Sequence, residues 1–149
     1  MLVIGDINIA RTKADSFPEL RMGRVHVENR ADFEGKFFGG QKSRSTSELG
    51  EKEKEGKGDD DARSKEVGHH GEQARLDMTD AFRHLHGDKR KSTYRPTHKP
   101  WGAGGDRVDM ALVTRGLVNR VEEADILDTE EDRSYSDHVP LFVKMAWET

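Results

Sequence analysis

Apolar residues are concentrated in three short runs of this chain, and these runs limit the folds that it can adopt. They are residues 2–4, residues 108–113 and residues 141–143. Only 32% of the 149 residues are hydrophobic and 36% are charged, so a core must be assembled from a few such segments. Short apolar runs bounded by polar residues are typical of buried strands. The sequence therefore predicts one domain, spanning residues 1–149, in which the three runs form strands.

Acidic, amide and imidazole side chains stand at the ends of all three runs. Asp6 and Asn8 follow the first run, Asp109 lies at the start of the second, and Asp137 and His138 precede the third. Ligand sites commonly lie where the strands of an open sheet end. We therefore expect these five side chains to converge on one pocket.

These residue types suit the hydrolysis of a phosphodiester. That reaction needs an activated water and neutralisation of the charge that develops on the phosphate, which a Mg²⁺ ion held by one or two carboxylates supplies. His138 can exchange a proton near neutral pH if a carboxylate orients it, and Asp109 is the candidate partner. Asp6 can accept a proton from the water or approach the metal, Asn8 can donate a hydrogen bond to the phosphate, and Asp137 can ligate the metal.

Three motifs carry a resemblance to a known family. GDIN at residues 5–8, DRVD at residues 106–109 and SDHVP at residues 136–140, in this order, resemble the endonuclease/exonuclease/phosphatase superfamily, and most closely its apurinic/apyrimidinic (AP) endonuclease branch. DAFR at residues 80–83 is similar to the DxFR segment of that family. The resemblance implies an α/β fold, namely the C-terminal half of a DNase I-like α/β-sandwich with a mainly antiparallel sheet and short flanking helices.

The resemblance also implies roles for the residues at the three motifs. It assigns Asp6 to water activation, Asn8 to the scissile phosphate, Asp109 to the orientation of His138, and Asp137 to the neighbourhood of the metal. The expected metal-binding residues are therefore Asp6, Asn8, Asp137 and His138, with Mg²⁺ as the ion and Mn²⁺ as the alternative. The implied function is that of a divalent-metal-dependent phosphodiesterase or endonuclease resembling the AP endonucleases of DNA repair.

A basic segment with interleaved aromatic residues, residues 88–101, predicts contact with DNA. The net charge of −4 gives no general attraction to nucleic acid, so binding requires a local patch. Cations neutralise phosphates and flat rings stack on exposed bases, although an ordinary charged loop explains the basic residues equally well. The expected DNA-binding residues are Arg83, Lys89, Arg90, Lys91, Tyr94, Arg95, Lys99, Trp101 and Arg107.

Other segments are predicted from local patterns. Residues 10–29 favour a loop, and residues 29–38 a short helix that is capped by Asn29 and carries Phe33 and Phe37 on one face. Residues 41–71 are rich in Ser, Gly, Lys and Glu and predict a disordered insertion. A second short helix is expected after Asp80, burying Phe82 and Leu85. The acidic residues 121–132 predict a solvated face.

The resemblance leaves two alternatives open. The first half of the family's sandwich would lie upstream of Met1, so one sheet face is expected to be exposed and to associate with that missing half or with a second copy. The chain is then either an enzyme or a catalytically silent, truncated relative that serves as a binding module. Relatives that hydrolyse inositol phosphates, sphingolipids or RNA share the same motifs, and Met110 and Asp106 replace the Tyr and Trp common in AP endonucleases.

The sequence lacks cysteine and lacks any long apolar run, and each absence excludes a class of site or structure. There is no cysteine, which excludes disulfides, thiolate zinc sites and a cysteine nucleophile. No run approaches the roughly 20 apolar residues that span a bilayer. We therefore expect no membrane partner and a nuclear or cytoplasmic location.

Overall fold

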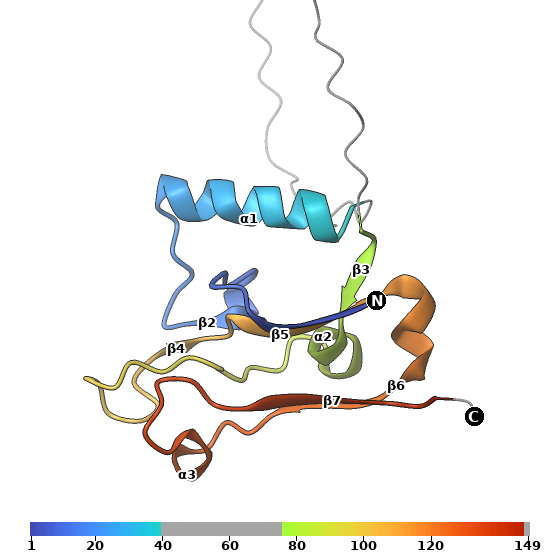
Figure 1. Ribbon diagram of the computed structural model, residues 1–149. Helices are drawn as coiled ribbons and strands as arrows, with labels where there is room; N and C mark the ends of the chain where they lie inside the picture. The colour runs from blue at the N-terminus through green and yellow to red at the C-terminus, as the bar shows by residue number, and fades with distance from the viewer. Residues whose placement is uncertain (40–75, 148–149) are drawn as a thin grey trace, which may run out of the picture.

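A computed structural model describes residues 1–39 and 76–147, and the predicted insertion at residues 41–71 lies outside them (Figure 1). The described elements are short strands interspersed with helices and 3-10 turns. The strands are β1 (Leu2–Asp6), β2 (Ser16–Phe17), β3 (Met78–Asp80), β4 (Gly105–Asp106), β5 (Asp109–Thr114), β6 (Val121–Ile126) and β7 (Leu141–Met145). The helices are α1 (Arg24–Phe37), α2 (Ala81–His86) and α3 (Glu130–Arg133), with 3-10 turns η1 (Lys13–Asp15) and η2 (Arg115–Arg120).

Every pairing between these strands is antiparallel, as predicted, and all three apolar runs form strands. β5 is the centre of a sheet with the order β1-β5-β3, β2 pairs with β4, and β6 pairs with β7. The register of β1 on β5 sets Asp6 directly opposite Asp109. These two residues, which lie about a hundred residues apart in the sequence, are therefore cross-strand neighbours.

The apolar run of β5 is buried on both faces because its side chains alternate between two layers. Met110 and Leu112 pack with Phe33 of α1 on one side. Ala111 and Val113 pack against the β6–β7 pair on the other. Figure 1 shows this order, with α1 on one side of the central sheet and the β6–β7 pair on the other. β5 therefore lies between two packed layers, and its burial fixes the position of Asp109 at the start of the strand.

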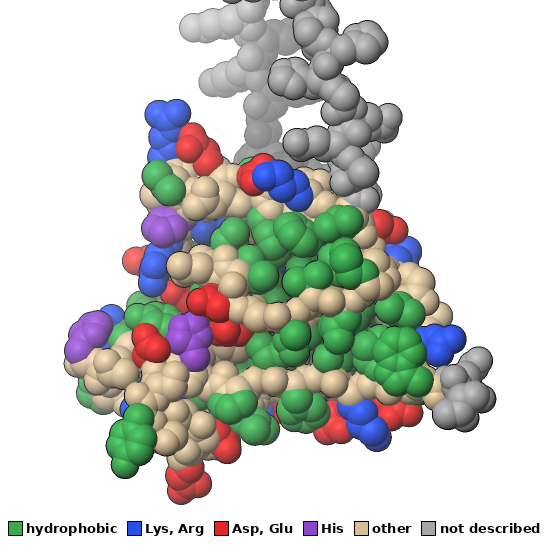
Figure 2. All heavy atoms as spheres, viewed as in Figure 1, with side chains coloured by type: hydrophobic (Ala, Val, Ile, Leu, Met, Phe, Trp, Pro, Cys, Tyr) green, Lys and Arg blue, Asp and Glu red, His purple; other side chains and the backbone are tan. Residues whose placement is uncertain are grey.

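β1 departs from the prediction of a buried strand. Within the described residues it pairs only with β5, and its side chains alternate, so that Val3 packs inward while Leu2 and Ile4 remain 41% and 51% exposed. Figure 2 shows apolar side chains gathered on the face between α1 and β7. An exposed apolar surface is therefore present, and its association with another chain stays a prediction.

The first long helix starts earlier than predicted. α1 begins at Arg24, with Gly23 at the cap position and no side-chain capping bond, whereas Asn29 lies inside the helix. The predicted loop at residues 10–29 is therefore wrong for residues 24–29, and the predicted capping by Asn29 is wrong as well. The aromatic face is as expected, since the rings of Phe33 and Phe37 lie 4.7 Å apart.

The second helix follows its predicted signals, with one exception. The Asp80 carboxylate accepts a hydrogen bond from the backbone N–H of Arg83 at 3.2 Å, and Gly87, at φ 56°, ends the helix. Phe82 is buried, but Leu85 remains 39% exposed, so its predicted burial is wrong. In a helix of six residues only one narrow stripe reaches the core.

The acidic segment is not simply a solvated face. Its first half forms β6, which buries Val121, Ala124 and Ile126. A register shift between Val121 and Glu123 breaks the alternation that would have signalled a strand. No helix within the described ranges has the length and apolar character needed to cross a bilayer.

Candidate functional site

Asp6, Asp109 and His138 lie together at one end of the β1–β5 pair. His138 Nδ1 lies 2.8 Å from Asp109 Oδ2, and one ligand atom from each of the three residues lies within 4.8 Å of the others. A carboxylate at this distance accepts the Nδ1 proton and leaves Nε2 as the free ring nitrogen. Asp6 is exposed, whereas Asp109 and His138 are half-buried. The three form a compact acid–imidazole group that solvent can reach.

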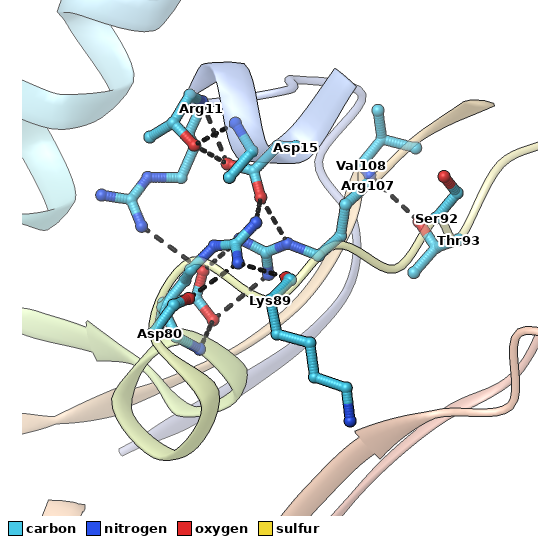
Figure 3. Close-up of polar contacts among 12 residues, drawn as sticks. Arg11, Asp15, Asp80, Lys89, Ser92, Thr93, Arg107 and Val108 are labelled. Carbon is cyan, nitrogen blue, oxygen red and sulfur yellow. Dashed lines mark hydrogen bonds and ion pairs between the residues drawn. The ribbon is translucent and has the colours of Figure 1, made fainter. Parts of the chain in front are cut away.

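The segment at Thr93 and Tyr94 brings His138 to Asp109. Thr93 Oγ1 accepts hydrogen bonds from the backbone N–H groups of Val108 and Asp109 at 3.0 and 2.9 Å, and the first of these contacts is visible in Figure 3. The backbone N–H of Val139 donates to the Thr93 carbonyl at 2.8 Å. Tyr94 forms an isolated antiparallel bridge with His138, and their rings lie 5.4 Å apart. This short segment therefore connects the start of β5 to the residues before β7.

A cluster of buried ion pairs is centred on Arg107, which precedes Asp109 by two residues. Arg107 is 1% exposed; its Nε donates to Asp15 at 2.6 Å and its Nη2 to Asp80 at 2.6 Å (Figure 3). Arg83 also donates to Asp15. Burial alone lowers the pKa of Arg107, but the charges of Asp80 and Asp15 outweigh it and raise that pKa. The cluster joins η1, α2 and the start of β5.

The Asp15 carboxylate makes this cluster sensitive to acid. Burial raises its pKa, but the charges and hydrogen bonds of Arg107 and Arg83 outweigh burial, and the pKa lies below the ordinary 3.8. A lowered pKa contributes stability that is complete above the unfolded value and is lost as the pH falls through the folded value. We therefore expect the free energy of unfolding to fall below about pH 4 more steeply in the wild type than in Asp15→Asn. Urea unfolding at a series of pH values measures this difference, and parallel profiles for the two proteins would contradict it.

A polar cavity of about 290 Å³ opens beside the three residues. Asn8 belongs to its wall, and its positive φ of 56°, a conformation that Asn tolerates better than most residues, turns the chain after β1. The backbone N–H of Asn8 donates to Asp6 Oδ1 at 2.7 Å. The lining residues are Asp6, Asn8, Ile9, Ala10, Leu20, Arg21, His26, Asn29, Arg30, Tyr94, Asp106, Val108 and His138.

Asp137 is not brought into this group. Adjacent side chains of an extended segment point in opposite directions, so the side chain of Asp137 is exposed while His138 faces Asp109. The Asp137 carbonyl instead accepts a hydrogen bond from the backbone N–H of Arg95 at 2.8 Å. Among the described residues, the cluster of potential metal ligands consists of Asp6, Asp109 and His138. The metal-binding role expected of Asp137 therefore stays a prediction, and the cluster that the fold brings together contains Asp109 instead.

The donor set of this cluster suits a divalent cation. Mg²⁺ binds through one or two carboxylates together with water and substrate phosphates, and Mn²⁺ also accepts imidazole. Asp6 and Asp109 provide the carboxylates, and the Nε2 atom of His138 is the remaining nitrogen. The cluster therefore fits the ions that the sequence predicts.

Several of the cations expected to contact DNA are engaged within the protein. Arg107 and Arg83 belong to the buried cluster, Lys91 pairs with Asp125 at 2.7 Å, and Arg95 pairs with Asp128 at 2.8 Å. The Arg95 guanidinium also lies 4.5 Å from the centroid of the Trp101 ring, which occupies one face of that ring. Their contact with DNA stays a prediction, and these ion pairs leave them less charge to offer to phosphates. Tyr94 lines the cavity, and the exposed cations are Lys89, Arg90 and Lys99.

Sequence reasoning missed the wall of the cavity that α1 provides. His26, Asn29 and Arg30 recur at intervals of three and four residues, which places them on one face of a helix. Because residues 10–29 were predicted to form a loop, their helical spacing was not recognised. Extending the helix to Arg24 would have revealed that these polar residues continue, toward the N-terminus, the face that carries Phe33 and Phe37.

The architecture around this site is an α/β DNase I-like fold. The chain matches no model of a protein family and no curated protein sequence. Solved structures do match it. They include the 3′ phosphatase NExo from Neisseria bound to product DNA hairpin, with 17% identity, and the 3′-5′ exonuclease NExo from Neisseria meningitidis, with 18% identity. Each has a TM-score of 0.53, and the alignment covers 98% of this chain and 45% of NExo.

Proposed function

We propose that this chain is a divalent-metal-dependent phosphoesterase that acts on DNA, of the AP endonuclease type. The observation that carries the proposal is the 2.8 Å contact between His138 and Asp109 beside Asp6, at the edge of a polar cavity. This arrangement supplies an oriented proton acceptor and an acidic group within reach of one bound phosphate.

Each residue of the site has a separate role in the proposed reaction. Asp109 holds His138 with Nε2 free, so this nitrogen takes a proton from water or, when protonated, donates to a phosphate oxygen. Asn8 donates a hydrogen bond to the phosphate without adding negative charge. Asp6 and Asp109 would hold the cation, which, when bound, neutralises the charge that develops on the phosphate oxygens.

DNA is favoured over other phosphoesters by two observations. NExo, which shares the fold, is described as a 3′ phosphatase and a 3′-5′ exonuclease, and one of its structures contains a product DNA hairpin. The exposed cations Lys89, Arg90 and Lys99 of this chain come from the segment that also carries Tyr94. Phosphate contacts from such exposed cations supply affinity for a nucleic acid strand.

Removal of the metal tests the proposal. We expect the purified chain to release phosphate from a DNA hairpin with a 3′ phosphate, or to incise a duplex with one abasic site, in the presence of Mg²⁺ or Mn²⁺. EDTA is expected to abolish the reaction and added Mg²⁺ to restore it, because the charge on the phosphate would otherwise be neutralised only by His138. Hydrolysis of neither substrate by the wild type would refute the proposal and favour a catalytically silent binding module.

A further inference from the structure

The cavity beside the acid–imidazole group is also lined by basic side chains. His26, Asn29 and Arg30 come from one face of α1, and Arg21 comes from the segment before it. Asp6 and His138 line the same cavity from the ends of β1 and of the segment before β7. The cavity is therefore lined both by acidic groups suited to a metal and by basic groups suited to an anion.

Arg30 is the charge on this wall that lacks an acidic partner within the described residues. Its Nη2 donates to the carbonyl of Arg21 at 2.8 Å and lies 3.7 Å from the sulfur of Met22. Neighbouring arginines are compensated, since Arg21 pairs with Asp106 at 3.1 Å and Arg24 with Glu28 at 2.7 Å. The Arg21 carbonyl therefore holds the Arg30 guanidinium in place without neutralising its charge.

The rest of the Arg30 guanidinium suits an incoming anion. The described contacts occupy only Nη2, which leaves Nε and Nη1 with hydrogen atoms to donate. A planar guanidinium binds two phosphate oxygens in a fork, and such charge-assisted bonds are stronger than neutral ones. His26 and Asn29 on the same face add further groups that can donate a hydrogen bond.

We propose that Arg30, supported by Arg21, binds the phosphate adjacent to the one held at Asp6, Asp109 and His138. The site then takes a nucleic acid strand, which carries a second phosphate, in preference to an isolated phosphomonoester. This inference rests on the proposed function and deepens it, because it names the feature of the substrate that α1 recognises. Arg30 acts as a specificity-determining residue and has no part in the proton transfer.

Binding without catalysis provides the first test. The dissociation constant of a labelled single-stranded oligonucleotide is measured by fluorescence anisotropy in EDTA at several salt concentrations, for the wild type, Arg30→Gln and Arg24→Gln. Arg24 lies on the same helix but outside the cavity lining, and its side chain is 89% exposed, so its variant removes the same charge from the surface. We expect Arg30→Gln to weaken binding about tenfold and to reduce the salt slope by about 0.7, with little effect of Arg24→Gln.

A second measurement identifies the phosphate involved. A substrate with an uncharged methylphosphonate next to the scissile phosphate is expected to raise the KM of the wild type but not that of Arg30→Gln, because the variant has already lost the contact. Arg30→Lys keeps the charge and is expected to restore the salt slope but not the full affinity.

The outcomes separate this inference from the proposed function. Equal weakening by Arg30→Gln and Arg24→Gln, or equal sensitivity of the wild type and Arg30→Gln to the methylphosphonate, would overturn the role of Arg30 while leaving DNA hydrolysis intact. A wild type that neither binds the oligonucleotide nor hydrolyses DNA would overturn both. Thermal unfolding of each variant is measured alongside, and Arg30→Met, which also removes the charge, replaces Arg30→Gln if the latter does not fold.

Discussion

The variant His138→Ala is expected to hydrolyse DNA about 10²–10⁴-fold more slowly than the wild type at saturating Mg²⁺. The imidazole is the group of this site that can exchange a proton near neutral pH, and Asp109 holds it at 2.8 Å in one orientation. Alanine removes the proton acceptor and leaves the Asp109 carboxylate without its partner. The loss should appear in kcat, because the imidazole acts on the reacting groups and not on the rest of the strand.

The control for this variant is His84→Ala. His84 lies on the exposed side of α2 and does not line the cavity, so its replacement removes the same side chain from a site without a catalytic role. Its rate is expected to match that of the wild type. Thermal unfolding of both variants is measured alongside, because His138→Ala also removes the hydrogen bond from His138 to Asp109.

The variant Arg107→Met is expected to lower the free energy of unfolding by about 3–5 kcal/mol. Methionine fills a similar volume, but Asp15 and Asp80, which are 2% and 3% exposed, lose the buried cation that they share. Asp15 keeps Arg83, and Asp80 keeps Arg11 at 3.4 Å. Two buried carboxylates that share less positive charge than before cost more than the lost ion pairs contributed. Urea unfolding followed by circular dichroism measures the change.

Two further variants test the origin of that loss. Arg115→Met removes an exposed arginine that pairs with Asp77 at the surface, where an ion pair contributes little, so it should unfold almost like the wild type. Adding Asp15→Asn and Asp80→Asn to Arg107→Met should recover part of the stability, because both carboxylates then lose their charge and Asn still caps α2. A loss for Arg107→Met no larger than that for Arg115→Met would contradict the role of the buried cluster.

The elements that the sequence predicted well are those whose signals are local. The three apolar runs form β1, β5 and β7, because short apolar segments with polar ends have few other ways to be buried. The capping of α2 by Asp80 was also predictable, since Asp80 and its partner Arg83 lie three residues apart in the sequence. The pairing of Asp109 with His138 was expected from motif order and is present at hydrogen-bond distance.

The features that the sequence did not predict depend on distant partners. Arg107 was assigned to DNA, but its partners in the fold, Asp15 and Asp80, lie 92 and 27 residues away in the sequence. β6 was missed because a register shift and exposed acids obscure its alternation. The role of Thr93, which accepts the backbone N–H of Asp109, has no signature in a single sequence.

The central claim is that Asp6, Asp109 and His138 form one phosphoesterase site. The most direct test is the initial rate of phosphate release from a DNA hairpin with a 3′ phosphate, measured with Mg²⁺ for the wild type and His138→Ala side by side. The structure predicts a wild-type rate that EDTA abolishes and that falls at least about 100-fold in the variant. Equal rates for the two proteins would contradict it.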